Sequence, residues 1–270
     1  MVAIAALLAS AWASPALAED GGGKEEKKEE SDRFSGKNWP KSLAQRPLVL
    51  APFMVELRGD FFRIDMSSGS IGDPVSMAPD LFVGVTKHTT VGIVQEIGYC
   101  VSGDGCSGRY NDVGIEAIRS LTYGGIFELA WRATWVMNPL DPFTSGVKMG
   151  IRARLGGGQF ALRLDPNIYV GLFNRDGDGT PENPGRAEGI DVPIELQFQV
   201  SEQNAAFFST GISGPLKNFA EANQVPIGLG GLFALGHRFD VGAEFRFTNL
   251  LGQGGGISGR LLLMRLAVRI

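Results

Sequence analysis

One repeated unit dominates the sequence: about ten residues alternate apolar and polar side chains, and a connection follows. The region from about Leu48 to Ile270 holds twelve such runs, and short and long connections alternate along it. The short connections are residues 86–90, 120–124, 155–159, 201–204 and 236–238, and the long ones are residues 66–79, 100–109, 137–146, 173–188, 213–226 and 248–259. A membrane-spanning antiparallel barrel sorts its connections in this way, because tight turns lie at one end and long loops at the other. A soluble sandwich has no such requirement.

The runs predict strands that separate apolar from polar side chains. Phe127, Leu129, Trp131 and Trp135 share one face of their run, because successive side chains of a strand point to opposite sides. Secreted sandwiches and lipocalins alternate similarly, but their strands usually have about 5–6 residues, whereas a spanning strand needs about 9–11. Aromatic residues near the run ends also favour the membrane. We therefore predict an all-β fold, a 12-stranded antiparallel up-and-down transmembrane β-barrel over residues 48–270.

Composition excludes two other classes of protein. Charged residues make up 20% of the chain, and the mean hydropathy is +0.04. Beyond the first 18 residues, no stretch reaches the roughly 20 apolar residues of a spanning helix. The net charge is only -4 and no basic patch is interleaved with aromatic residues, so nothing indicates binding of nucleic acid.

The first 47 residues lack the alternating pattern. Residues 1–13 are almost wholly apolar and a small-x-small cleavage site ends at Ala18, so we predict a signal peptide over residues 1–18. No Lys or Arg precedes the apolar run, and a hydrophobic anchor is the alternative. Residues 19–47 carry a dense run of Lys and Glu and are predicted to be a charged, disordered periplasmic N-terminal linker. The linker is either a solvated tail or an arm that docks a periplasmic protein.

The two cysteines, Cys100 and Cys106, lie close together in one long connection. An exported protein meets an oxidising environment, so we predict a disulfide at the loop tip. Two free thiols are the alternative. A metal site is disfavoured because no His or further Cys is nearby in the sequence.

Taken together, the export signal, the strand pattern and the terminal run 261–270 resemble a bacterial outer-membrane β-barrel of porin-like type. The resemblance is one of architecture and covers the chain after about Leu48, without a family-specific motif. It implies a bacterial outer-membrane location, contact with outer-membrane lipid, and short connections on the periplasmic side together with the N-terminal linker. Such barrels commonly end in an aromatic residue, whereas this chain ends in Ile270.

Catalytic residues are not indicated. Most outer-membrane enzymes need a His paired with Ser or Asp at the outer rim. The two histidines, His88 and His237, fall in short connections, several strands apart and on the periplasmic side. We therefore expect no enzyme activity and interpret both as turn residues.

One long connection resembles the first half of an EF-hand-type calcium loop, in which alternate oxygen ligands wind round a hard cation. The candidate calcium ligands are Asn174, Asp176, Asp178, Thr180 and Glu182. Position twelve of the loop is Gly185, where a bidentate Glu is expected, so any calcium would bind weakly. The alternative is an acidic, Gly-rich surface turn; no other cofactor is expected.

Charged residues on the polar faces are the candidate lumen lining. They are Arg132, Lys148, Arg152, Arg154, Arg163, Glu116, Glu128, Asp191, Glu195, Glu244 and Arg246. A wet lumen would have a basic wall and an acidic wall, whereas a filled lumen would pair the same charges into a network. Twelve strands lie between filled eight-stranded barrels and open sixteen-stranded porins. The first hypothesis is a narrow porin-like channel for small polar or charged solutes. The alternative is a structural component that anchors a multiprotein envelope complex for motility, adhesion or secretion.

Overall fold

The computed structural model describes residues 37–270 except residues 68, 70, 97, 104–105, 107–111, 123–124, 141–142 and 177–185. These residues belong to the compact unit Arg33–Ile270. The predicted signal peptide and the part of the predicted linker before residue 37 lie outside the described residues.

Almost all regular structure in the described residues is β-strand. No helix there is long and apolar enough to cross a membrane. The elements are η1 (Leu43–Gln45), β1 (Val55–Asp65), β2 (Val75–Thr86), β3 (Thr89–Val94), β4 (Tyr99–Ser102), β5 (Val113–Ser120), β6 (Phe127–Met137), β7 (Ser145–Gly157), β8 (Phe160–Leu164), β9 (Asn167–Phe173), β10 (Gly189–Gln199), β11 (Asn204–Pro215), α3 (Phe219–Ala222), β12 (Ile227–Leu235), β13 (Phe239–Phe247) and β14 (Arg260–Arg269).

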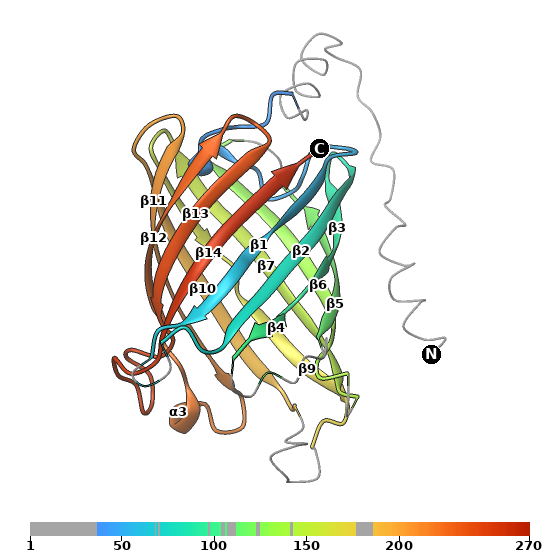
Figure 1. Ribbon diagram of the computed structural model, residues 1–270. Helices are drawn as coiled ribbons and strands as arrows, with labels where there is room; N and C mark the ends of the chain where they lie inside the picture. Colours follow the sequence, from blue (N-terminus) through green and yellow to red (C-terminus); the bar gives the residue numbers. More distant parts are fainter. Residues whose placement is uncertain are drawn as a thin grey trace. The chain divides into compact units, whose positions relative to one another are not determined.

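The strands form one closed antiparallel barrel (Figure 1). Neighbours along the chain pair with each other, and β14 pairs with β1 to close the ring. The fourteen described segments make twelve spanning strands, because two of these strands are interrupted. Segments β3 and β4 both pair with β2, and β8 and β9 both pair with β7 and β10. The predicted 12-stranded up-and-down barrel is confirmed.

Prolines explain the interruption between β8 and β9. Pro166 has no N–H to donate to the ladder of backbone hydrogen bonds, and Pro193 of the neighbouring strand β10 also lacks this donor. Their carbonyl groups still accept hydrogen bonds, from the Ile151 amide at 3.1 Å and the Asp165 amide at 3.1 Å respectively. The wall therefore stays continuous while the chain bends beside Asp165.

The two faces of the barrel wall are inverted relative to a soluble protein. Large apolar side chains on the outside are exposed around the whole ring, including Leu81, Ile93, Ile115, Met149, Ile151, Ile168, Leu196, Leu229, Val241, Phe245 and Met264. Polar side chains on the inside are buried, including Glu56, Glu116, Glu128, Arg154, Gln197, Asp240, Glu244 and Arg269. A soluble monomer rarely exposes a continuous apolar surface of this extent, whereas a barrel in lipid requires it.

The predicted sorting of connections is also present. Every short connection lies at the end that carries the C-terminus, at the top of Figure 1, and we call it the short-turn end. The described parts of the long connections lie at the opposite end, which we call the long-loop end. Several boundaries differ from those expected: β2 begins at Val75, β4 includes Cys100, β7 runs to Gly157 and β11 runs to Pro215, so these strands extend into residues expected to be connections.

Candidate channel in the barrel lumen

Residues 38–54 cross the short-turn end of the barrel (Figure 1), and we call them the luminal segment; Trp39, Leu43, Ala44, Arg46 and residues 49–51 are buried there, whereas Phe53 is exposed at the rim. Its backbone is bound by side chains from strands all round the wall. The Leu48 amide donates to Glu128 of β6 at 3.1 Å, and the Leu50 amide donates to Thr90 of β3 at 2.8 Å. Arg154 of β7 donates to the Ala44 carbonyl at 2.6 Å. Only a segment in the lumen can reach these strands together with β13, to which Arg46 binds.

This placement corrects the expected linker boundary at Pro47. Trp39 is only 2% exposed, and it belongs with Leu50 and Met54 to an apolar cluster that includes Phe82 and Ile118 of the wall. Residues 38–47 are therefore packed in the lumen and are not a disordered tail. The apolar run 48–54 was the available signal, because its side chains do not alternate and so do not fit a lipid-facing strand.

A glycine in the wall makes room for the luminal segment. A Cβ atom on Gly84 of β2 would lie 2.0 Å from the Ala51 carbonyl oxygen. The Gly84 carbonyl accepts from the Phe53 amide at 2.7 Å, and the Gly84 amide donates to the Met54 carbonyl at 2.8 Å. The end of the segment is thus fixed to β2 by backbone bonds before β1 begins.

Arg46 makes the main charged contact of the luminal segment. Its guanidinium binds Asp240 of β13 with two hydrogen bonds of 2.7 and 2.8 Å. Asp240 also accepts from Arg269 at 2.5 Å, and Arg269 in turn binds Glu56 at 2.5 Å. Burial lowers the pKa of Arg46 from its ordinary value, and the hydrogen bond to Asp240 acts in the opposite direction. An arginine side chain stays protonated in proteins, so the contact is an ion pair.

Two further charge clusters lie in the middle of the lumen. In the first, Arg132 and Arg152 both bridge Glu116 and Asp165. Arg132 lies 3.4 Å from the Glu116 carboxylate and 2.6 Å from that of Asp165. Arg152 lies 3.3 Å from the Glu116 carboxylate and 2.8 Å from that of Asp165. The second is centred on Arg265, which lies 3.1 Å from Glu195, 2.5 Å from Glu244 and 3.6 Å from Asp60. Arg246 completes it with a 2.8 Å contact to Glu244. Each cluster pairs charges from several strands.

At the long-loop end, Glu96 lies between two cations, Lys148 of β7 and Arg186 of the β9–β10 connection. The Arg186 guanidinium also stacks 4.1 Å from the Tyr169 ring centroid. Burial acts to lower the pKa of Arg186, but the hydrogen-bonded Glu96 carboxylate outweighs burial, so the pKa lies above its ordinary value.

All the charged residues expected in the lumen lie on the inner face of the wall. Ten of them either form the ion pairs already described or contact the luminal segment, and the eleventh, Asp191, lines two cavities. They do not form one basic and one acidic wall, since carboxylates are interleaved with the arginines. Four further lumen residues were not predicted, although all of them stand on polar faces of the alternating runs: Asp165, Asp240, Arg265 and Arg269. Arg46 and Glu96 carry no periodic signal.

Charged cavities remain between these clusters. One of about 490 Å³ is lined by side chains including Arg58, Asp80, Glu116 and Lys148. Another of about 580 Å³ is lined by wall residues including Arg163 and by Leu43 and Leu48 of the luminal segment. On the other side of the segment, two cavities of about 510 and 500 Å³ open among the short turns.

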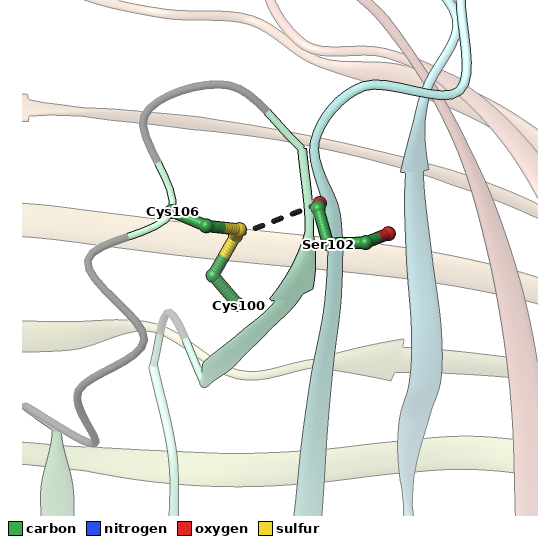
Figure 2. The surroundings of a disulfide bond; sticks show 3 residues. All are labelled: Cys100, Ser102 and Cys106. Atoms are coloured by element: carbon green, nitrogen blue, oxygen red, sulfur yellow. Dashed lines mark hydrogen bonds between the residues drawn. A yellow bond between two sulfur atoms is a disulfide. The ribbon is translucent and has the colours of Figure 1, made fainter.

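The disulfide between Cys100 and Cys106 is present, with a Cα–Cα distance of 5.5 Å (Figure 2). The Ser102 carbonyl oxygen lies 3.8 Å from Sγ of Cys100. The bond closes a small loop at the long-loop end, next to the end of β4.

The remaining candidates have these positions. Both histidines lie in short turns, and Nδ1 of His237 is 2.6 Å from the Trp39 carbonyl oxygen. Of the calcium candidates, Asp178, Thr180 and Glu182 lie outside the described residues. The Asn174 amide donates to Thr144 at 3.0 Å, and Asp176 is exposed. Within the described residues, no group of three or more His, Cys, Asp or Glu could hold a metal ion.

Comparison with known proteins supports the fold. No protein-family model matches the chain, and no curated protein matches it. Among solved structures, a NanC porin is similar at a TM-score of 0.55 and 8% identity, covering 79% of this chain and 98% of that chain. The KdgM porin is similar at a TM-score of 0.50 and 6% identity, covering 80% of this chain and 97% of that chain. The chain is therefore a transmembrane β-barrel with a porin-like fold.

Proposed function

We propose that the protein is a narrow passive channel for small polar or charged solutes. The observation that carries this proposal is the pair of charged cavities of about 490 and 580 Å³ inside a closed barrel. Each cavity lies within the range of about 300–1,000 Å³ typical of small-molecule sites. Although the lumen charges pair with one another, these cavities leave space between the pairs that a filled lumen would lack.

The mechanism is diffusion past fixed charges. A solute leaves part of its water shell and exchanges hydrogen bonds with side chains such as Arg132 and Glu116, as in other pores lined by charged rings. Because cations and carboxylates alternate round the lumen, a solute that carries both donors and acceptors finds partners at each level. We therefore expect the channel to favour polar or zwitterionic solutes and to discriminate little between cations and anions.

The orientation that fits is the short-turn end in the periplasm and the long-loop end outside the cell, as in other outer-membrane barrels. The luminal segment then lies at the periplasmic mouth, and the Cys100–Cys106 disulfide lies on the exterior side, where thiols are oxidised.

Planar-bilayer recording of the refolded full chain tests the proposal. We expect discrete conductance steps that scale with salt concentration, and reversal potentials of small magnitude in a salt gradient. A heat-denatured sample at the same protein and detergent concentration is the control. If neither the folded wild type nor the folded variant Arg46→Gln, which lacks the ion pair with Asp240, gives steps above this control, the channel is refuted.

The other role, an anchor for a multiprotein envelope complex, remains the alternative. A periplasmic partner of the N-terminal linker is part of that alternative. Catalysis is not part of either proposal, because the two solved structures described above are porins and the two histidines lie in separate short turns.

A further inference from the structure

We infer that the luminal segment is a gate, which closes the short-turn end in this conformation and opens when residues 38–48 leave the lumen. The inference rests on the proposed channel function. It assigns control of the pore to the stretch before the first strand, instead of to a long loop.

The first support is the position of the cavities. The 580 Å³ cavity has Leu43, Pro47 and Leu48 as its floor and otherwise consists of lumen wall. The 510 Å³ cavity lies between Trp39 with its neighbours and the tips of the short turns. The luminal segment stands between the two, so a solute that moves from one to the other must pass it.

The second support is that the segment is held unevenly. Residues 49–54 are anchored by the apolar cluster, by backbone bonds to Gly84 and by the Leu50–Thr90 bond. Residues 38–48 contribute only Trp39 and the partly buried Leu48 to that cluster, so exposure of Trp39 is the apolar cost of opening, and their backbone is held by charged side chains, such as Arg154 on the Ala44 carbonyl. Water can replace a hydrogen bond of this kind in a wet lumen, whereas the apolar anchor resists exposure. The boundary near residue 48 is therefore where the segment would bend.

The third support is that two of the wall residues that bind the segment, Asp240 and Arg154, have other partners when it leaves. Asp240 binds Arg46 but also binds Arg269 at 2.5 Å. Arg154 binds the Ala44 carbonyl but also binds Glu128 at 3.1 Å. Release of residues 38–48 therefore leaves neither of these buried wall charges unpaired, and an unpaired buried charge is the main penalty that would keep a plug fixed.

The Arg46–Asp240 pair is the latch in this scheme, and the variant Arg46→Gln tests it. Glutamine removes the charge and the two-pronged contact. Arg175→Gln is the matched control, because Arg175 pairs with Glu188 in an exposed loop at the other end of the barrel. In bilayers, we expect the open probability of Arg46→Gln to be at least about tenfold above that of the wild type, and that of Arg175→Gln to be unchanged.

A second variant closes the gate. In Arg46→Cys/Asp240→Cys, a thiol-reactive cross-linker that contains a reducible disulfide joins the segment to β13. We expect conductance to fall below the wild-type value and to return when the linker is reduced. Wild-type channels with and without reductant control for the native disulfide. Circular dichroism and heat-modified gel mobility verify that each variant contains a folded barrel.

The results separate the two proposals. If the wild type conducts and Arg46→Gln does not differ from it, or if the cross-linked form conducts as well as the wild type, the gate is refuted and the channel stands. If the folded wild type, Arg46→Gln and the uncross-linked double variant all fail to conduct, the channel itself is refuted and the gate with it.

Discussion

Replacement of Asp240 by Ala should destabilise the barrel more than any change to an exposed ion pair. Asp240 is 1% exposed and joins Arg46 to Arg269, which are 5% and 4% exposed. Removing one partner of a buried pair costs about 3–5 kcal/mol. Each arginine keeps another contact, because Arg269 still binds Glu56 at 2.5 Å and Arg46 still donates to the Lys41 carbonyl at 3.1 Å. We therefore expect the free energy of unfolding to fall by about 3 kcal/mol.

Urea titration in detergent micelles, followed by tryptophan fluorescence, measures this loss, provided that unfolding is reversible. Glu188→Ala is the control, since its partner Arg175 is about half exposed and such pairs contribute about 0–1 kcal/mol. The double variant with Arg46→Ala closes a thermodynamic cycle, for which we expect a coupling of about 1–3 kcal/mol. A loss in Asp240→Ala no larger than in Glu188→Ala, or a coupling near zero, would refute the reasoning.

Three further changes have distinct expected outcomes. Glu116→Gln leaves two lumen arginines short of one carboxylate, so the reversal potential in a KCl gradient should shift toward anion preference; no shift would show that this cluster does not line the conducting path. Gly84→Ala places a Cβ atom 2.0 Å from a carbonyl of the luminal segment, and should lower the free energy of unfolding by about 1–3 kcal/mol in the same urea assay; an unchanged value would contradict the tight fit. Cys100→Ser/Cys106→Ser opens a short loop far from the gate, so the free energy of unfolding should fall by about 2 kcal/mol at most and the single-channel conductance should be unchanged. An altered conductance would place this loop in the pore.

The barrel could be predicted because strand faces are written in the local sequence. A strand alternates its side chains with period two, so Phe127 and Leu129 are apolar where they meet lipid, and Glu128 is charged where it meets the lumen. The lengths of the connections follow from the same local pattern. The interruption at Pro166 also has a local cause, although the expected runs treated the strand as unbroken.

The charge pattern of the lumen could be predicted only in part. That Arg132, Arg152 and Glu116 point inward follows from their alternate positions. That they share Asp165 depends on how far neighbouring strands are shifted along each other, and no short-range pattern specifies this shift. The order of strands left open whether the charges would form separate acidic and basic walls or a paired network; they pair, because arginine side chains are long enough to reach carboxylates on other strands.

By itself, the sequence determined the closed antiparallel barrel, its number of strands, its lipid-facing surface and the sorting of its turns, since each depends on side-chain alternation over a few residues. Only the tertiary structure decided what fills the short-turn end. Arg46 and Asp240 are 194 residues apart in the chain and meet because the barrel closes round the segment between its walls. A contact of that kind has no local signature, and it is the contact on which opening of the lumen depends in the mechanism that we infer.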